Sequence, residues 1–415
     1  MIRKPFDKHW RNFLFICLIP IFVFQCRPNG LKNHCDPNQS SYLQNLTLLL
    51  GVSESAYFCG NLIQSPFLNK IKIPRFIIVT NVGLDAATSS ISVFRINPNT
   101  GEISQVSGSP FQLSNRPRFT VTNSTGTVVY VPNIGNKSVS VLNLNPETGS
   151  LSLKHPDLVL SSTPYSLALD PNGKYLYASS EQNPEIHRMA IGSNDNLTIL
   201  SPAMPTSNPS GGSVGRLSFD SKGNHLYVGL TSAPGNNAGI QVFSLDPSTG
   251  NLSSINVYIT GINNLSLGIS PNGKFVYGSN YSSENVFPFV RDINSGTLSI
   301  QTSISAGVAP GYTIVDPLNR FVYVANSGTG QGTISAYLIE PSNGTLTPVN
   351  GSPFSTGFSP IGLCTDPRGK FLYSSNTEGG NISGFSVGEN GVLTPLSGFP
   401  VTAGTNPFSI EMVSY

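Results

Sequence analysis

The stretch Asp170–Tyr177 reads Asp-Pro-Asn-Gly-Lys-Tyr-Leu-Tyr, and close copies of it recur through most of the chain. In this turn, proline presets φ and glycine takes the positive-φ position. The turn leads into an apolar strand that carries a tyrosine. Further copies are Asp220–Tyr227, Ser270–Tyr277, Asp316–Tyr323 and Asp366–Tyr373, with looser copies ending at Tyr130 and Val79. Copies roughly fifty residues apart indicate a repeat architecture.

The residues around each copy predict four antiparallel strands. A short strand precedes the turn, as in 165–169, and the strand after the turn runs into an asparagine in most copies. The third strand alternates, as in 334–339, so one of its faces packs against the next unit. A Pro-x-Thr-Gly turn, as at Pro146–Gly149, then leads to a short outer strand. Four-stranded units repeated at this spacing are typical of a β-propeller.

The two ends of the repeat region predict how the ring closes. The first copy begins at Arg75 with its second strand, and residues 407–413 read as an innermost strand that no further strand follows. Each end supplies what the other lacks, which leaves no open sheet edge. The sequence therefore predicts an all-β fold over 75–415: a seven-bladed propeller of four-stranded antiparallel blades, its first blade closed by the C-terminal strand.

The composition restricts the classes of ligand. The net charge is +2 and only 11% of residues are charged. Because nucleic-acid binding needs a cationic patch that releases counterions, we expect no nucleic acid as partner. His34 stands beside Cys35 and Asp36, but no second pair of metal ligands stands at zinc spacing. We therefore expect neither a metal nor another cofactor. A closed ring has no structural need of a second copy, and we expect a monomer.

The N-terminus predicts export. A cationic segment over 3–11 precedes the apolar run Phe13–Phe24, which is too short to span a bilayer and suits a signal peptide over 1–25. Cys26 then resembles a bacterial lipobox cysteine. Acylation there would anchor the protein to a lipid membrane, in the periplasm or at the outer membrane or cell surface, with 26–74 as a linker. Cleavage nearby by ordinary signal peptidase and an uncleaved anchor are the alternatives.

Three cysteines remain after the signal peptide and Cys26. Export permits disulfides, and Cys35 and Cys59 are natural partners because both lie outside the repeats. Cys364 lies in an apolar strand and is expected to be a buried free thiol.

The repeats resemble a known family. Gly273–Tyr277, Val322–Asn326 and Gly344–Val349 are similar to segments of the seven-bladed lactonases. These include propeller-type 6-phosphogluconolactonases and muconate cycloisomerase relatives, and the repeats also resemble the YVTN-repeat propellers of exported proteins. The resemblance covers 75–415 and implies the fold more strongly than the chemistry.

The resemblance also implies a site. Active lactonases of this type share a Pro-Arg-His step at the start of an inner strand and an Asn-Glu step at the end of the next strand. The strand starts of this chain include Pro117-Arg118-Phe119 and Gly215-Arg216-Leu217, without histidine, and a glutamate follows a second strand only at Glu181. The resemblance thus implies catalytic residues Glu181 as acid/base, with Arg118 and Arg216 holding an anion.

Strand topology places the starts of inner strands and the ends of second strands on one rim. We therefore expect ligand-binding residues there, namely Arg116, Tyr165, Tyr281 and Tyr312. The densest ionisable group of the repeats, Glu181, Glu185, His187 and Arg188, is an alternative place for acid/base chemistry. Because the expected histidine is missing, the sequence favours a membrane-tethered scaffold that binds a protein, glycan or small molecule on this rim. The alternative is a lactonase-like hydrolase of the 6-phosphogluconolactonase type acting on a sugar lactone.

Overall fold

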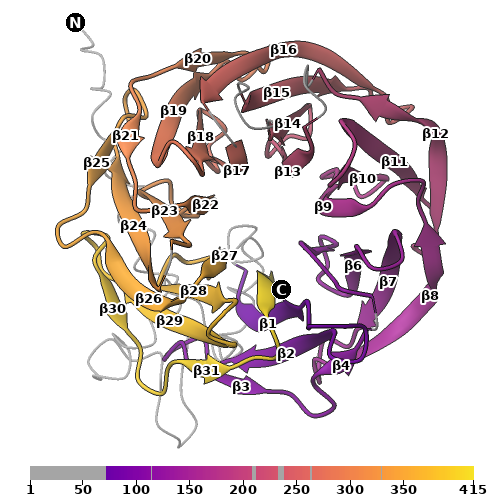
Figure 1. Ribbon diagram of the computed structural model, residues 1–415, viewed down its shortest axis with the longest axis horizontal. Coiled ribbons are helices and arrows are strands. Elements are labelled where there is room, and N and C mark those ends of the chain that lie inside the picture. Colours follow the sequence, from indigo (N-terminus) through magenta and orange to yellow (C-terminus); the bar gives the residue numbers. More distant parts are fainter. Residues whose placement is uncertain (1–71, 114, 208–211, 232–237, 262–263, 329) are drawn as a thin grey trace, which may run out of the picture. The chain divides into compact units, whose positions relative to one another are not determined.

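The computed structural model describes residues 72–113, 115–207, 212–231, 238–261, 264–328 and 330–415. The chain divides into two compact units, Met1–Lys72 and Ile73–Tyr415. The second unit is a ring of seven antiparallel sheets, called blades 1 to 7 (Figure 1). The predicted propeller is confirmed. The predicted signal peptide, Cys26, Cys35 and Cys59 lie outside the described residues.

The first four blades contain four or five strands each. Blade 1 contains β1 (Pro74–Asn81), β2 (Ser90–Ile96), β3 (Ile103–Gln105), β4 (Phe111–Gln112) and β32 (Pro407–Ser414). Blade 2 contains β5 (Val121–Thr122), β6 (Val128–Asn133), β7 (Ser138–Leu144) and β8 (Leu151–Val159). Blade 3 contains β9 (Pro164–Leu169), β10 (Tyr175–Ser180), β11 (Glu185–Ile191) and β12 (Leu197–Pro205). Blade 4 contains β13 (Val214–Phe219), β14 (His225–Leu230), β15 (Ala238–Leu245) and β16 (Leu252–Gly261).

The remaining blades have an outer strand that is split in two. Blade 5 contains β17 (Asn264–Ile269), β18 (Phe275–Asn280), β19 (Asn285–Arg291), β20 (Leu298–Ile300) and β21 (Ile304–Ser305). Blade 6 contains β22 (Pro310–Val315), β23 (Phe321–Asn326), β24 (Gln331–Ile339), β25 (Leu346–Pro348) and β26 (Phe354–Phe358). Blade 7 contains β27 (Pro360–Thr365), β28 (Phe371–Asn376), β29 (Asn381–Val387), β30 (Leu393–Pro395) and β31 (Val401–Thr402). The inner strands are β32, β5, β9, β13, β17, β22 and β27.

The recurrent turn forms because its first residue caps it. In blade 3 the Asp170 carboxylate accepts the backbone N–H of Lys174 at 2.7 Å and that of Tyr175 at 2.6 Å. Gly173 takes φ +68°, a conformation that favours glycine. The turn therefore joins an inner strand to the second strand of the same blade without unpaired backbone groups.

The ring closes as the sequence predicts. β32 pairs antiparallel with β1, and Ile410 stands opposite Val79. At the ends of these strands, Ile73 and Tyr415 exchange backbone hydrogen bonds of 2.8 and 3.1 Å. Blade 1 is thus built from both ends of the repeat region, and its inner strand is the last strand of the chain.

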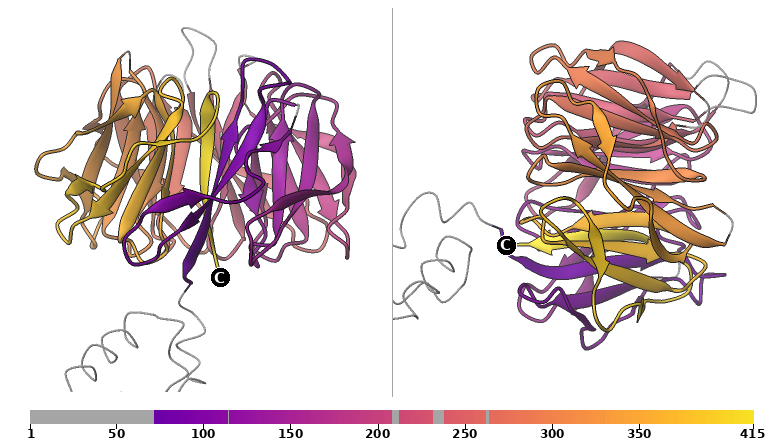
Figure 2. Two further views of the ribbon diagram at one scale, coloured as in Figure 1. Left: turned by 90° about the horizontal axis from the view of Figure 1, so that it is seen from below. Right: turned by 90° about the vertical axis from the view of Figure 1, so that its left-hand side faces the viewer.

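The two faces of the ring differ. The "site rim" is the face where inner strands begin and second strands end, and the opposite "turn face" carries the Asp-Pro-Asn-Gly type turns. β32 begins on the site rim at Pro407 and ends toward the turn face, where Tyr415 pairs with Ile73 (Figure 2). Both ends of this unit therefore lie on the turn face. Among the described residues, none forms a helix long and apolar enough to cross a membrane.

The core lies between neighbouring blades. The tyrosines of the repeat are fully buried, and Tyr277 of blade 5 packs with Val322 and Tyr337 of blade 6. Cys364 is a buried free cysteine, as predicted. Because each blade buries one face against the next, the period-two pattern of the sequence determines the packing.

Most of these tyrosines also bridge two blades by a hydrogen bond. The Tyr277 hydroxyl donates to the carbonyl of Gly344 at 3.0 Å, and Tyr177, Tyr227 and Tyr373 make the same bond to a glycine of the next blade. In blade 7 the corresponding turn is one residue shorter, with Gly391 bonded back to Gly388. The Tyr323 hydroxyl of blade 6 accordingly has no hydrogen-bond partner within the described part of the chain.

This difference provides a matched pair of variants. Tyr277→Phe is expected to lower the free energy of unfolding by about 1 kcal/mol, because it leaves the Gly344 carbonyl unpaired. Tyr323→Phe is expected to leave the free energy of unfolding unchanged or to raise it, because it removes a buried hydroxyl that lacks a partner. Urea unfolding of both variants measures this, and equal losses would contradict it.

Candidate active site

Four aromatic side chains meet at the centre of the ring, near the site rim. Phe119 of blade 2 lies 5.4 Å from Tyr165, 5.6 Å from Tyr312 and 4.9 Å from Phe408, measured between ring centroids. Tyr165 meets it edge to face, an arrangement that aromatic quadrupoles favour. These residues belong to blades 1, 2, 3 and 6, so this "aromatic cluster" links blades on different sides of the axis.

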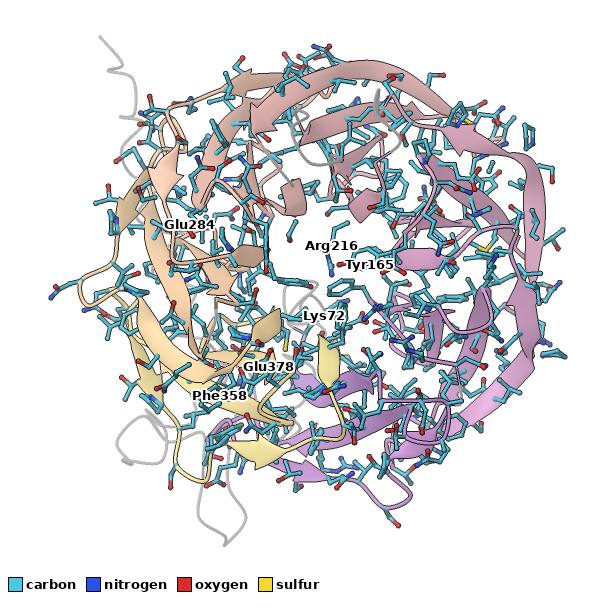
Figure 3. All side chains as sticks on the ribbon, in the orientation of Figure 1. Lys72, Tyr165, Arg216, Glu284, Phe358 and Glu378 are labelled. Carbon is cyan, nitrogen blue, oxygen red and sulfur yellow. The ribbon has the colours of Figure 1, made fainter. Side chains whose placement is uncertain are left out.

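Two arginines stack on the aromatic cluster. The guanidinium carbon of Arg216 lies 4.3 Å from the ring centroids of both Phe119 and Tyr312. That of Arg118 lies 4.3 Å from the centroid of Phe408. Figure 3 shows Arg216 and Tyr165 directed toward the centre of the ring. Cation–π contacts of this kind hold both charges at the axis while leaving N–H edges available.

Glu181 pairs with one of these arginines. It follows β10 directly, its backbone N–H donates to the Thr163 carbonyl at 2.8 Å, and its Oε1 lies 3.7 Å from Arg118 Nη2. Burial lowers the pKa of Arg118, while the charge of Glu181 opposes this. An arginine guanidinium is not deprotonated in proteins, so Arg118 carries a positive charge. The structure therefore brings Arg118, Glu181 and Arg216 together.

Both guanidinium groups keep unused donors. Arg118 Nε and Arg216 Nη1 are buried and have no hydrogen-bond partner among the residues described. A buried donor without a partner is unfavourable by about 1–3 kcal/mol, and by more for a charged group. Such donors suit an anionic or carbonyl oxygen of a bound ligand.

The register of the inner strands separates the two arginines by one position. In blade 2, Pro117 forms a bridge with Asn133, and Arg118 is the first residue after it. In blade 4, Val214 pairs with Leu230, and Arg216 is the second residue after it. From the sequence alone, Gly215 matches Pro117 and both arginines share one step, but in the structure Val214 is the counterpart of Pro117. Arg216 accordingly occupies the position of Phe119 in its strand, which explains their contact.

The asparagines that end the second strands have a structural role. Asn133 Nδ2 donates to Ser138 Oγ and Ser140 Oγ on the third strand, at 3.1 and 2.8 Å. Asn81, Asn326 and Asn376 make equivalent pairs of bonds. Blade 3 has Ser180 at this position, followed by Glu181.

The other predicted ligand-binding residues divide into two groups. Tyr165 and Tyr312 belong to the aromatic cluster, and burial raises the pKa of both phenols. Arg116 is exposed on the site rim and acts on Arg118 only through its charge. Tyr281 follows β18, is 38% exposed and lies outside the aromatic cluster. Sequence reasoning missed Phe408, although it follows Pro407 as Tyr165 follows Pro164.

The ionisable group of blade 3 does not form one site. His187 Nε2 lies 2.7 Å from Ser162 Oγ and 3.7 Å from Glu185 Oε1. His187 is 3% exposed, and desolvation lowers its pKa. Arg188 instead points to the neighbouring blade and bonds Asn251. Among the described residues, no three His, Cys, Asp or Glu side chains gather as metal ligands would.

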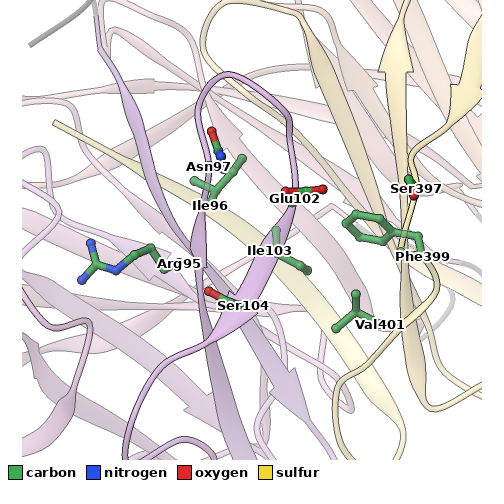
Figure 4. Close-up of a pocket in the computed structure, with 10 residues that line it drawn as sticks. Arg95, Ile96, Asn97, Glu102, Ile103, Ser104, Ser397, Phe399 and Val401 are labelled. Atoms are coloured by element: carbon green, nitrogen blue, oxygen red, sulfur yellow. The ribbon is translucent and has the colours of Figure 1, made fainter.

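A separate cavity of about 610 Å³ lies at the outer edge of the ring, between blades 1 and 7 (Figure 4). Ile96, Glu102 and Ile103 line it from blade 1, and Phe399 and Val401 line it from blade 7. Neither arginine of the aromatic cluster contributes to its lining. It therefore is distinct from the central site.

Comparisons with known proteins agree with this arrangement. The family model described as lactonase, 7-bladed beta-propeller, matches residues 69–164, 160–307 and 289–408. A 6-phosphogluconolactonase of Formosa agariphila is 25% identical over 313 residues, which cover 59% of this chain and 86% of that protein.

Solved structures show the same fold. A protein from Bacteroides fragilis has a TM-score of 0.71 and 21% identity, covering 82% of this chain and 98% of its own. The periplasmic gluconolactonase of Pseudomonas aeruginosa has a TM-score of 0.68 and 17% identity, covering 81% of this chain and 99% of its own.

The preference for a binding scaffold, drawn from the missing histidine, is wrong. The lactonase family model matches most of the chain, and the Formosa agariphila relative is a lactonase. Arg118 pairs with Glu181, and both Arg118 and Arg216 stack on the aromatic cluster. The chain belongs to the family of seven-bladed β-propeller lactonases.

Proposed function

We propose that this protein is a lactonase that hydrolyses a sugar lactone at the aromatic cluster. The observation that carries the proposal is the meeting of two half-buried arginines and one carboxylate at the aromatic cluster of a lactonase-family propeller. The name of the Formosa agariphila relative supports gluconolactones, with or without a 6-phosphate, as the first substrates to test.

The three charged residues would divide the chemistry. Glu181 accepts a proton from the water that attacks the lactone carbonyl, so that a new C–O bond forms. Arg118, paired with Glu181, stabilises the negative charge that develops on the carbonyl oxygen. The ring C–O bond then breaks, and the proton held by Glu181 passes to the departing ring oxygen. Arg216, which stacks on Phe119 and Tyr312, holds a hydroxyl or anionic group of the sugar acid.

This assignment replaces the histidine of the family pattern with Glu181. In the step Pro117-Arg118-Phe119, phenylalanine stands where the resemblance implies histidine, and its ring supports Arg216 instead. Tyr165 and Tyr312 remain protonated at neutral pH because burial raises the pKa of their phenols. They can donate a hydrogen bond to substrate but cannot serve as bases.

The proposal extends to the cell envelope. The cationic segment, the apolar run and Cys26 support an exported protein tethered to a membrane by an acylated cysteine. An enzyme placed there would meet lactones outside the cytosol. We propose that it acts as a monomer with a small-molecule substrate on the site rim.

Purified protein assayed at constant pH with glucono-δ-lactone and 6-phosphoglucono-δ-lactone tests the proposal. We expect hydrolysis well above the uncatalysed rate, reduced about 10²-fold or more by Arg118→Ala, since one oxyanion donor contributes roughly that much. Lys174→Ala, an exposed change on the turn face, serves as the control and should retain wild-type turnover. Uncatalysed rates with folded wild-type protein would refute the proposal.

A further inference from the structure

One register position of the inner strands carries a charge in only one blade. It lies opposite the recurring tyrosine of the second strand, or opposite Ile78 in blade 1. In blades 2 to 7 it holds Val121, Ala168, Ser218, Gly268, Ile314 and Cys364. In blade 1 it holds Glu411, opposite Ile78. A carboxylate on an inner strand needs partners to offset the loss of hydration.

Glu411 finds these partners in the neighbouring blade. Its Oε1 accepts the backbone N–H of Thr122 at 2.9 Å and the Thr122 hydroxyl at 2.8 Å. Its Oε2 accepts the Thr120 hydroxyl at 3.1 Å. Three bonds therefore run from one carboxyl of β32 to the inner segment of blade 2.

That segment has little pairing of its own. β5 consists of two residues, whereas β9, β13, β17, β22 and β27 have six each. Before β5, Pro117 and Phe119 make isolated bridges to Asn133 and Ser166, and the Arg118 N–H donates to the Pro132 carbonyl at 2.9 Å. A segment with so few ladder bonds depends on side-chain contacts for its position.

The same segment carries part of the candidate active site. Arg118 and Phe119 precede Thr120 directly, and Arg118 stacks on Phe408 of β32, the strand that holds Glu411. Burial raises the pKa of Glu411, while the bonds from Thr122 and Thr120 and the charge of Arg216 lower it. The bonded carboxyl thus connects the two strands that bring Arg118 and Phe408 together.

We propose that Glu411 is a positioning residue, which holds the 117–122 segment so that Arg118 and Phe119 face the substrate. The inference rests on the proposed lactonase function for its kinetic consequence, but its structural consequence is independent of activity. Glu411 touches no substrate and acts through Thr120 and Thr122.

Hydrogen exchange followed by mass spectrometry tests the structural part. In Glu411→Ala the Thr122 amide loses its acceptor, so exchange over 117–122 should become at least about tenfold faster, while β9 keeps wild-type exchange. Glu411→Gln keeps an acceptor for Thr122 and should restore slow exchange. Ser414→Ala, in the same strand, is the control. Unchanged exchange over 117–122 in Glu411→Ala would overturn the inference, whatever the activity.

Kinetics test the functional part. Glu411→Ala should lower kcat for lactone hydrolysis about 10-fold to 100-fold, as displacement of a catalytic group by about 1 Å does, and Glu411→Gln should recover most of it. If exchange over 117–122 is faster in Glu411→Ala but its turnover equals that of wild-type protein, the positioning role is refuted. Absence of turnover in wild-type protein would refute the lactonase proposal instead, and the exchange experiment would still decide on Glu411.

Discussion

Replacement of Glu181 by glutamine is expected to lower kcat for lactone hydrolysis by about 10²–10⁴-fold, the usual contribution of a general acid/base. Glutamine has nearly the same shape as glutamate and keeps a polar oxygen near Arg118, whose Nη2 lies 3.7 Å from Glu181 Oε1 in the wild-type protein. It cannot take a proton from water. Because substrate binding relies on the arginines, KM should change far less than kcat.

Glu378→Gln provides a matched control. Glu378 follows the second strand of blade 7 by two residues, on the same rim, and Figure 3 shows it away from Arg216 and Tyr165. Its replacement should leave both kcat and KM at wild-type values. Equal losses in the two variants would indicate a general effect of rim charge. Full activity in Glu181→Gln would show that another group carries the proton.

The fold could be predicted from the sequence because its pattern is local. The turn before Tyr177 recurs in blades 2 to 7, the alternation along the strands recurs in every blade, and the missing inner strand at Arg75 matches the extra one after Pro407. The turn and the alternation each lie within about ten residues, the range over which turn chemistry and strand period act.

The site could be predicted only in part, because it depends on register. Arg118, Glu181, Tyr165 and Tyr312 can be identified from their distance to strand ends. The position of Arg216 against Phe119 depends on the inner strand of blade 4 beginning at Val214, which alternation does not reveal. The contacts of Glu411 join residues almost three hundred positions apart, and no local pattern indicates them.

A buried charge between blades 4 and 5 allows the largest prediction for stability. Arg291 is the last residue of the third strand of blade 5. The residues at the same position in blades 4 and 6 are apolar, Leu245 and Ile339. Its guanidinium pairs with Asp220 and also bonds the Tyr227 hydroxyl and the Gly273 carbonyl. Arg291 is 5% exposed and Asp220 2%, so neither charge is well hydrated.

Arg291→Leu is therefore expected to lower the free energy of unfolding by about 3–5 kcal/mol, because it leaves the Asp220 carboxylate buried without its cation. Urea or thermal unfolding of the variant beside wild-type protein measures this loss.

The double variant Arg291→Leu/Asp220→Ser decides whether the charge or the packing is responsible. Blade 5 has Ser270 at the position of Asp220, and the Ser270 hydroxyl still caps its turn by accepting the Phe275 N–H at 2.8 Å. Removing both charges should therefore recover stability to within about 1 kcal/mol of wild type, since an apolar replacement for a buried ion pair is often neutral. A double variant as unstable as Arg291→Leu would attribute the loss to packing around Tyr227 and Gly273. Recovery would show that blades 4 and 5 tolerate the apolar contact used elsewhere in the ring, and that Asp220 requires Arg291 because its charge is buried.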